Sequence, residues 1–231
     1  TDLFLYNRMP GTVWGAQNEY ISSPHLDDVQ CAYASVKAML KGHHRESISV
    51  CCVFDNEEVG SGTKQGAASS FLKDVLERIA FGLGMNAEEL KMLLSEISAD
   101  NAHAVHPNHM DKADPTNRPY MNGGIVIKYN ANQRYTTDAV SAAVFQEICR
   151  KAEVPVQSYV NRSDVPGGST LGNIASHQVS VNMVDIGLAQ LAMHSPYETA
   201  GVRDTAYLIR ALETFYNTGI RREKDGTYRF S

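Results

Sequence analysis

"ISVCCVFDNEEVGSG", residues 48–62, joins a continuous apolar run to an acidic turn that ends in glycine. Residues 48–54 are mostly β-branched or apolar and have the length of one strand, a pattern typical of a strand buried on both faces. Such strands belong to sheets that helices cover on both sides. The carboxylates of Glu57 and Glu58 stand where this strand would end, although ionised groups are costly to bury without a partner.

Strand and helix patterns alternate through the rest of the chain. Further strands are predicted at 123–130, 154–160 and 181–188, and a short strand is predicted ahead of the His-rich loop of "SEISADNAHAVHPNH" (95–109). Apolar residues at intervals of three and four predict helices at 26–40, 65–84, 86–94 with Asn86 as N-cap, 137–153, 169–178 and 197–218. This alternation predicts an α/β protein with one mostly parallel central sheet and helices on both of its faces.

Polar side chains follow the predicted strands. In open α/β sheets, ligands bind outside the carboxyl ends of the strands, so polar residues at these ends are expected to converge. The residues concerned are Glu57, Glu58, Asp100, His103, Lys128, the loop 167–169 and His194.

Composition narrows the class of protein. The 231 residues are 43% hydrophobic and 20% charged, which is ordinary for one globular domain. The net charge of -5, with scattered basic residues, argues against a nucleic-acid partner. The chain has neither an apolar run long enough to cross a membrane nor the pattern of a signal peptide, which predicts a cytoplasmic protein without a membrane partner. The four cysteines have no CxxC spacing and are expected to be small buried residues.

Adjacent carboxylates have a chemical use that requires both of them. One can bind a metal ion while the other accepts a proton from water that the ion activates. Asp27, Asp100 and His194 add further carboxylate and imidazole groups, which suit zinc, manganese or cobalt in a two-metal site.

Each of these residues also has a structural interpretation. Glu57 and Glu58 fit a solvated acidic turn, and Asp27 with Asp28 fits the first turn of a helix, where acidic residues complement the helix dipole. Asp100 lies in a His-rich polar loop, and a single histidine such as His194 is often a hydrogen-bonded core residue. The residues alone leave both interpretations open.

Six blocks in order resemble the signature blocks of one enzyme family. They are "SPHLDDV" (23–29), "DNEEVGSG" (55–62), "SADNAHAVHPNH" (98–109), "GGIVIKYNANQRYTTDA" (123–139), "VPVQSYVNRSDVPGGSTLGNIAS" (154–176) and "VDIGLAQLAMHSPYE" (184–198). Their order and spacing resemble the M18 metallopeptidases, the aspartyl aminopeptidases, from about Leu3 to Tyr216. The resemblance implies the zinc-aminopeptidase type of α/β fold and removal of N-terminal Asp or Glu from peptides.

The resemblance also implies roles for individual residues. Asp27 would bridge two divalent metal ions, zinc first, with manganese or cobalt as alternatives, and the peptide bond after it would be cis. Glu58 and His194 would complete one ion's ligands and Asp100 would bind the other ion. Glu57 would be the general base.

Substrate contacts are implied at two places. Lys128 would pair with the acidic side chain of the substrate, and a lysine at a strand end that merely reaches solvent is the structural alternative. Gly168, Ser169 and Thr170 would line the substrate pocket, with helix capping by Ser169 and Thr170 as the alternative.

The match has a gap at its beginning. The family has a further metal-binding histidine in an "HTDSP" block and a β-rich dimerisation domain ahead of the block with Asp27, and neither is found in this sequence. Residues 1–231 are therefore expected to form a single domain, the C-terminal part of the catalytic domain, with an incomplete sheet and impaired activity. The full-length parent is expected to be a homo-oligomer. The alternatives are a related dinuclear aminopeptidase of neutral specificity and a non-catalytic assembly or binding module that retains the fold.

Overall fold

A four-stranded sheet forms the centre of the computed structural model, which describes residues 3–43, 47–86, 89–90 and 95–231. Its strand order is β3 (Ser95–Ala99), β7 (Asn182–Gly187), β5 (Ile125–Tyr129) and β6 (Val156–Val160). The β3–β7 and β5–β6 pairs are parallel, and the β5–β7 pair is antiparallel. The predicted mostly parallel α/β sheet is confirmed.

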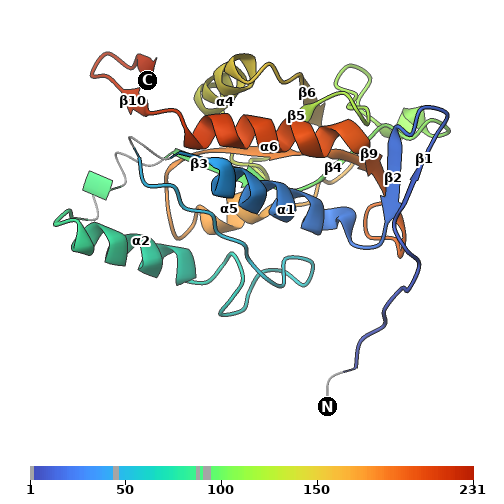
Figure 1. Cartoon of the computed structure of the whole chain (residues 1–231), viewed down its shortest axis with the longest axis horizontal. Helices are drawn as coiled ribbons and strands as arrows, with labels where there is room; N and C mark the ends of the chain where they lie inside the picture. Colours follow the sequence, from blue (N-terminus) through green and yellow to red (C-terminus); the bar gives the residue numbers. More distant parts are fainter. Residues whose placement is uncertain (1–2, 44–46, 87–88, 91–94) are drawn as a thin grey trace.

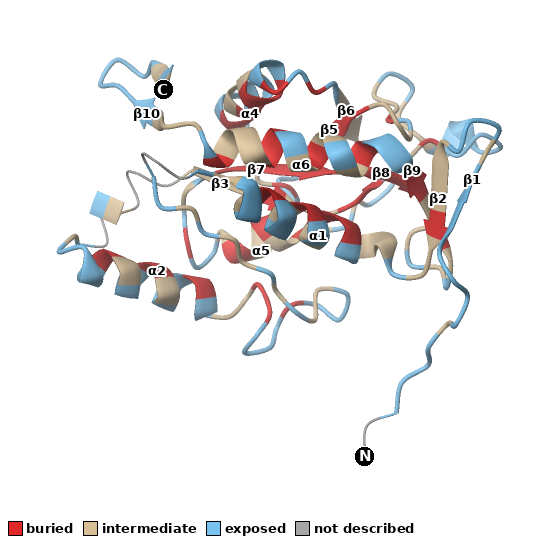
Figure 2. Cartoon of the chain, viewed as in Figure 1, coloured by how far each residue is buried: buried red, intermediate tan, exposed pale blue. Residues whose placement is uncertain are grey.

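Three helices cover one face of this sheet: α1 (Leu26–Lys41), α4 (Ala139–Lys151) and α6 (Val202–Tyr216). Figure 1 shows α1 and α6 lying side by side across the middle of the molecule. Their inner side chains form the main core with alternate residues of β5 and β7, such as Ile127 and Ile186. Figure 2 shows the buried residues concentrated on the sheet and on the helix faces turned toward it.

Two helices lie on the other side. The short helix α5 (Leu171–Ala175) contacts β3 and β7, and Gly172 allows this close approach, because a Cβ there would lie 2.6 Å from Asp185 Oδ1. Helix α2 (Phe71–Gly82) packs through Leu72 and Leu76 in a smaller cluster with Val179. Both faces of the central sheet are therefore covered, as predicted.

A second sheet extends from this core. Its strand order is β1 (Thr12–Trp14), β2 (Tyr20–Ser23), β9 (Glu198–Gly201), β8 (Ala189–Leu191) and β4 (Ala102–His103). The 3₁₀ turn Met110–Lys112 follows β4, and the hairpin β10 (Ile220–Arg222) and β11 (Tyr228–Phe230) ends the chain. The pairing of β2 with β9 matters for function, because it places Ser23 opposite Glu198 and so brings the start of α1 close to β9.

Some predicted elements are wrong. Residues 48–54 are extended but form no strand, because no described strand pairs with them. The helix predicted at 65–84 begins at Phe71, and the helix predicted from 197 begins at Val202, because Glu198–Gly201 pairs with β2.

The helix predicted at 86–94 falls largely outside the described residues. The expected N-cap contact is present nevertheless, since Asn86 Oδ1 accepts a hydrogen bond from the Glu89 backbone N–H at 2.9 Å. Within the described part of the chain, no helix has the length and apolar character needed to cross a membrane.

Candidate metal centre

The first turn of α1 carries the two aspartates in an unusual backbone. Asp27 and Asp28 have non-helical dihedral angles, His25 before them is left-handed at φ 58°, and the Asp27–Asp28 peptide bond is cis. The cis bond agrees with what the resemblance implies. The Asp27 side chain lies shortly after the end of β2 and is buried, with only 4% of it exposed.

Asp27, Glu58 and His194 meet at one point. His194 Nε2 lies 3.2 Å from Asp27 Oδ2 and 3.1 Å from Glu58 Oε2. The three residues come from the start of α1, the acidic turn and the loop after β8, so they are far apart in sequence. One donor atom from each lies within 4.8 Å of the others, which is the spacing of ligands around a single ion.

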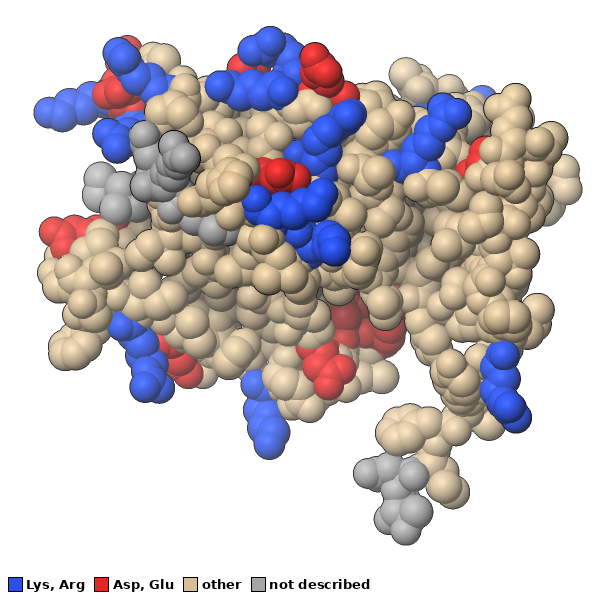
Figure 3. Space-filling view, in the orientation of Figure 1, with Lys and Arg blue, Asp and Glu red and all other residues tan. Residues whose placement is uncertain are grey.

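A second group of carboxylates shares Asp27. Donor atoms of Asp27, Asp28 and Asp100 also lie within 4.8 Å of one another. Asp100 directly follows β3, as the sequence predicted for a residue at the carboxyl end of a strand. Asp28 Oδ1 accepts a hydrogen bond from the Asn101 backbone N–H at 3.2 Å. Figure 3 shows acidic atoms gathered in a recess below α1, whereas the basic atoms occur in several separate groups.

Glu198 holds the backbones of Asp27 and His194 in place. Its Oε2 accepts a hydrogen bond from the Asp27 backbone N–H at 2.9 Å, and its Oε1 accepts one from the His194 backbone N–H at 2.8 Å. Glu198 is buried, with 2% of its surface exposed. One carboxylate thus holds the backbones of both Asp27 and His194.

The clustered carboxylates favour the binding of a cation. Burial, followed by the charges of Asp100 and Glu58, raises the pKa of Asp27 to about 8. Burial and the charge of Asp100 also raise the pKa of Asp28. Asp27 Oδ1 is buried and has no hydrogen-bond partner among the described residues. A divalent ion would supply the missing partner and offset the repulsion, and this mixture of imidazole and carboxylate donors fits zinc.

Glu57 lies beside this cluster and is partly buried. Burial, then the charges of Asp100 and Glu58, raises the pKa of Glu57 above its ordinary value. Glu57 and Glu58 belong to a tight turn in which Gly60 N donates to Glu57 O at 2.9 Å. The turn directs two adjacent carboxylates toward the same site.

Lys128 is joined to the cluster by Asp100. Its Nζ lies 3.0 Å from Asp100 Oδ2, and only 4% of its side chain is exposed. Burial favours the neutral amine, but the charges of Asp100, Tyr135 and Asp185 outweigh burial and raise the pKa of Lys128. The lysine is therefore charged and engaged by a carboxylate of the chain itself.

The loop 168–170 is linked to the metal-binding cluster indirectly, through Asp185. Among the contacts between described residues, none joins Gly168, Ser169 or Thr170 directly to the four predicted metal ligands. Thr170 Oγ1 donates to Asp185 Oδ1 at 2.8 Å and makes no side-chain cap of α5, while Ser169 Oγ accepts from Asn173 Nδ2 at 3.1 Å. The loop is connected to the site through Asp185, whose charge acts on Lys128.

Sequence reasoning missed three supporting residues. Glu198 ends the block "MHSPYE", but its distance of four residues from His194 does not by itself indicate a role. Asn101 is buried and donates through Nδ2 to Leu26 O and Gln190 Oε1 at 3.1 and 2.8 Å, and Asp185 anchors two loops. A polar residue next to a predicted ligand was the only signal that could have identified Asn101.

Several known proteins match most of this chain. An M18 family aminopeptidase 2 from Clostridium acetobutylicum is 48% identical over 219 residues, which cover 94% of this chain and 51% of that relative. A chain in the Ape4 and Nbr1 complex matches with a TM-score of 0.84 and 34% identity, over 91% of this chain and 42% of that chain. A chain of the S. cerevisiae mApe1 dodecamer matches with a TM-score of 0.78 and 26% identity, over 91% and 49% of the two chains.

The chain thus spans about half the length of the curated relatives it matches. The sequence model of the M18 peptidases, described as aminopeptidase I zinc metalloproteases, matches residues 1–216. The chain therefore belongs to the M18 family of zinc metalloproteases.

Proposed function

We propose that this chain forms the metal-binding part of an aminopeptidase that removes N-terminal Asp or Glu from peptides. The observation that carries the proposal is that possible metal-ligand atoms of three residues lie close together. His194 Nε2 lies within 3.2 Å of carboxylate oxygens of Asp27 and Glu58, and the other Asp27 oxygen is buried with no hydrogen-bond partner in the described part of the chain. This arrangement has no evident use in a protein that only needs to fold.

Two ions would share Asp27. Asp27, Glu58 and His194 would hold one ion, and Asp27 with Asp100 would hold the other, with Asp28 as an added carboxylate. Zinc is the proposed metal, and manganese or cobalt are alternatives. When bound, the metal would polarise the carbonyl of the scissile peptide bond and lower the pKa of water at the site.

Glu57 would act as the general base. Its carboxylate would take a proton from the attacking water and deliver it to the leaving amine. The raised pKa of Glu57, which burial and the charges of Asp100 and Glu58 cause, supports this role, because a base with an unperturbed pKa would hold the proton too weakly. Glu198 would keep Asp27 and His194 in position for both ions.

Lys128 would provide the preference for acidic residues. In the structure its ammonium pairs with Asp100. A divalent ion at Asp100 would compete for that carboxylate and leave Lys128 able to pair with the Asp or Glu side chain of a substrate. Gly168, Ser169 and Thr170 would form the adjacent wall of the pocket, where Asp185 anchors Thr170.

Zinc binding tests the site directly. The metal-free chain should take up Zn²⁺ in a competition titration with a chromogenic chelator, and His194→Ala should weaken binding by about 100-fold, because it removes a ligand. His177→Ala, at an exposed histidine of the segment after α5, is the matched control and should bind as the wild type does. Equal zinc affinity of the two variants would overturn the assignment of His194.

Turnover tests the reaction. The chain covers about half of its relatives' length, so we expect little hydrolysis of Asp- or Glu-p-nitroanilide by the isolated chain with Zn²⁺ or Mn²⁺. A polypeptide of the relatives' full length that contains this sequence should cleave both substrates faster than Leu-p-nitroanilide. Faster cleavage of the leucine substrate would favour a dinuclear aminopeptidase of neutral specificity, and absence of bound metal would favour a non-catalytic module.

The proposed assembly follows from the relatives. The matching mApe1 chain of S. cerevisiae forms a dodecamer. We propose that the parent protein of this chain is likewise a homo-oligomer and that residues 1–231 form its C-terminal catalytic portion, without the first strands of the sheet or the dimerisation domain.

A further inference from the structure

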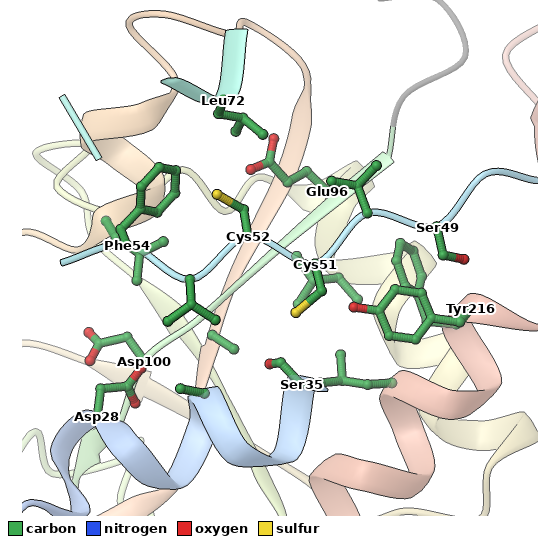
Figure 4. Close-up of a pocket in the computed structure, with 18 of the residues that line it drawn as sticks. Asp28, Ser35, Ser49, Cys51, Cys52, Phe54, Leu72, Glu96, Asp100 and Tyr216 are labelled. Atoms are coloured by element: carbon green, nitrogen blue, oxygen red, sulfur yellow. The ribbon is translucent and has the colours of Figure 1, made fainter. Parts of the chain in front are cut away.

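Asn101 is a buried neighbour of two carboxylates in the metal-binding cluster. It directly follows Asp100, and its backbone N–H donates a hydrogen bond to Asp28 Oδ1 at 3.2 Å. Figure 4 shows Asp28 and Asp100 close together at one end of a cleft that Glu96 also lines. Only 2% of the surface of Asn101 is exposed, so its side chain lies inside the molecule, beside these carboxylates.

The side-chain amide of Asn101 has three acceptors within reach. Its Nδ2 atom lies 2.8 Å from Gln190 Oε1, 3.1 Å from Leu26 O and 3.3 Å from Gln30 Oε1. A primary amide has two N–H groups, and the two shorter distances assign them to Gln190 and Leu26. The side chain of Asn101 therefore joins strand β8, which contains Gln190, to the residue that precedes Asp27.

The peptide group between Leu26 and Asp27 is held from both sides. Its C=O accepts the hydrogen bond from Asn101 Nδ2, and its N–H donates to Glu198 Oε2 at 2.9 Å. The C=O and N–H of a trans peptide group lie in one plane and point in opposite directions. Two buried side chains therefore fix the orientation of the peptide plane that ends at the Cα atom of Asp27.

Each of these two side chains is also linked to a second proposed ligand. Glu198 Oε1 accepts a hydrogen bond from the His194 backbone N–H at 2.8 Å, and Asn101 is the next residue after Asp100. Glu198 thus belongs with one proposed ion and Asn101 with the other. We call the two proposed ion positions the imidazole position, with Asp27, Glu58 and His194, and the carboxylate position, with Asp27, Asp28 and Asp100.

Filling space in the core does not account for Asn101. An apolar side chain of similar size would occupy the same volume without polar groups that must be satisfied. The acceptors of Asn101 are themselves held in place, since Gln190 is 1% exposed and Gln30 Nε2 donates to Thr205 Oγ1 on α6 at 2.8 Å. A buried network of this kind keeps its members in one arrangement, and ligands with a fixed spacing require such support.

We propose that Asn101 is a positioning residue for the carboxylate position and that it acts through the peptide group before Asp27. Its amide would hold the Asp27 carboxylate at the distance from Asp100 that an ion between them requires. Glu198 would have the same role at the imidazole position. The inference rests on the proposed function, because it concerns ions held by these carboxylates.

Stepwise binding of Co²⁺ tests this role, because the visible spectrum of the ion depends on its ligands and their geometry. Asn101→Leu keeps the approximate size of the side chain and removes both N–H donors. In a titration of the metal-free 231-residue chain, this variant should lose about 10-fold to 100-fold in affinity at the carboxylate position. The affinity and the spectrum of the imidazole position should stay as in the wild type. His194→Ala should show the reverse pattern.

The outcomes separate this inference from the proposed function. A wild-type chain that binds neither Co²⁺ nor Zn²⁺ would overturn both. If the wild type fills both positions, an Asn101→Leu variant that weakens neither of them, or weakens both equally, would overturn the role of Asn101 alone.

Ser141→Ala is the matched control for a purely structural loss. Ser141 is 7% exposed and belongs to the capping box of α4, where its Oγ accepts a hydrogen bond from Asp138 N at 3.0 Å. This variant should unfold at a lower urea concentration than the wild type and bind Co²⁺ unchanged in both steps. A change in its binding steps would show that lost stability alone explains the effect of Asn101→Leu.

Gln190→Met gives a second test if Asn101→Leu does not fold. It removes the acceptor at the other end of the shortest bond of Asn101 and leaves the bond to Leu26 in place. We expect a smaller loss, about threefold to tenfold, at the carboxylate position only. Wild-type affinity at this position would contradict the proposal.

Hydrogen exchange of the side-chain amide tests the network without metal. In the metal-free chain with EDTA, the N–H₂ protons of Asn101 should exchange about tenfold or more slowly than those of Asn108, which is exposed. Their NMR signals are identified by their absence in Asn101→Leu. Equally fast exchange of the two amides would show that the bonds to Leu26 and Gln190 do not persist in solution, and it would overturn the inference even if the chain binds metal.

Discussion

Single side chains organise the metal centre through the backbone. Glu198 is the clearest case, because each of its carboxylate oxygens accepts a hydrogen bond from the backbone of a proposed ligand residue. Hydrogen bonds to a charged acceptor are stronger than those between neutral groups. Glu198 would act on a bound metal ion without touching it, because its hydrogen bonds position Asp27 and His194.

Replacing Glu198 by Gln tests this positioning role. Glutamine keeps the size of the side chain, but it offers only one acceptor oxygen and turns an N–H₂ group toward a backbone donor. We expect zinc affinity to fall by about 10-fold to 100-fold. The measurement is a chelator-competition titration, with circular dichroism to confirm the fold.

Glu213→Gln on α6 is the control for that substitution, because the side chain of Glu213 lies away from the site and forms a surface ion pair with Lys41 at 3.9 Å. It should leave zinc affinity unchanged. Unchanged affinity in Glu198→Gln as well would mean that the backbone keeps its position without the carboxylate.

Elements are joined near the site by buried polar contacts rather than by apolar packing alone. Asp185 on β7 accepts hydrogen bonds from Thr136 N and Thr136 Oγ1 at 2.6 and 2.8 Å, and from Thr170 Oγ1 at 2.8 Å. It thus ties the loop after β5 and the start of α5 to the centre of the sheet. The loop proposed to bind substrate has this anchor at its end.

A double-mutant cycle measures the energy of the interaction between Thr170 and Asp185. Thr170→Val removes the hydroxyl but keeps the shape, and we expect it to cost about 1 to 2 kcal/mol in the free energy of unfolding. In the background of Asp185→Asn the same substitution should cost less, with a coupling energy of about 1 kcal/mol. Urea unfolding of the four proteins gives the energies, and strictly additive values would show that the two side chains do not interact.

The whole molecule carries several buried carboxyl groups that resist ionisation. Burial raises the pKa of Asp204 to about 6, and burial with the charge of Asp185 raises the pKa of Glu96 to about 7. Unfolding returns both to ordinary values. Between about pH 4 and 7 the folded chain therefore binds more protons than the unfolded chain, and these groups make stability fall as pH rises through this range.

Replacing Glu96 by Gln should flatten this dependence. At pH 8 the variant should be more stable than the wild type by about 2 kcal/mol, a value reduced for solvent in the cleft, and at pH 4 the two should be equal. Urea unfolding with EDTA at both pH values gives the comparison. Glu77→Gln, on the outer side of α2, should leave the profile unchanged. A variant that is less stable than wild type at pH 8 would show that the carboxylate makes a favourable contact there.

The sequence predicts the core strands and helices well because their patterns are local. A run of β-branched residues identifies β5, and the spacing of apolar residues identifies α1, α4 and α6. Residues 48–54 are also mostly apolar and β-branched, yet they form no strand, because a strand needs a neighbouring strand to pair with and composition does not report one. The short strands β1, β4 and β8 of the second sheet have too few residues to produce a pattern.

The predicted metal ligands come together in space. Their positions after predicted strands grouped Glu58, Asp100 and His194, and the match of ordered blocks added Asp27 and the role of each residue. Asp27, Glu58 and His194 are separated by long stretches of chain, and no spacing rule connects them. Glu198, Asn101 and Asp185 were not predicted, since each acts through hydrogen bonds to other residues. Such contacts depend on the distance between elements, which the sequence pattern does not contain.

The bond between Asp27 N and Glu198 also has a consequence for folding kinetics. It joins residues 171 positions apart, and it forms beside the β2–β9 ladder. Contacts of such high sequence separation are slow to form, because a long loop must close before they contribute. The proposed zinc ligands would thus be incomplete as a set until the N-terminal hairpin has docked. Uptake of zinc during refolding should lag behind the appearance of helix, and it would mark the moment at which β2 pairs with β9.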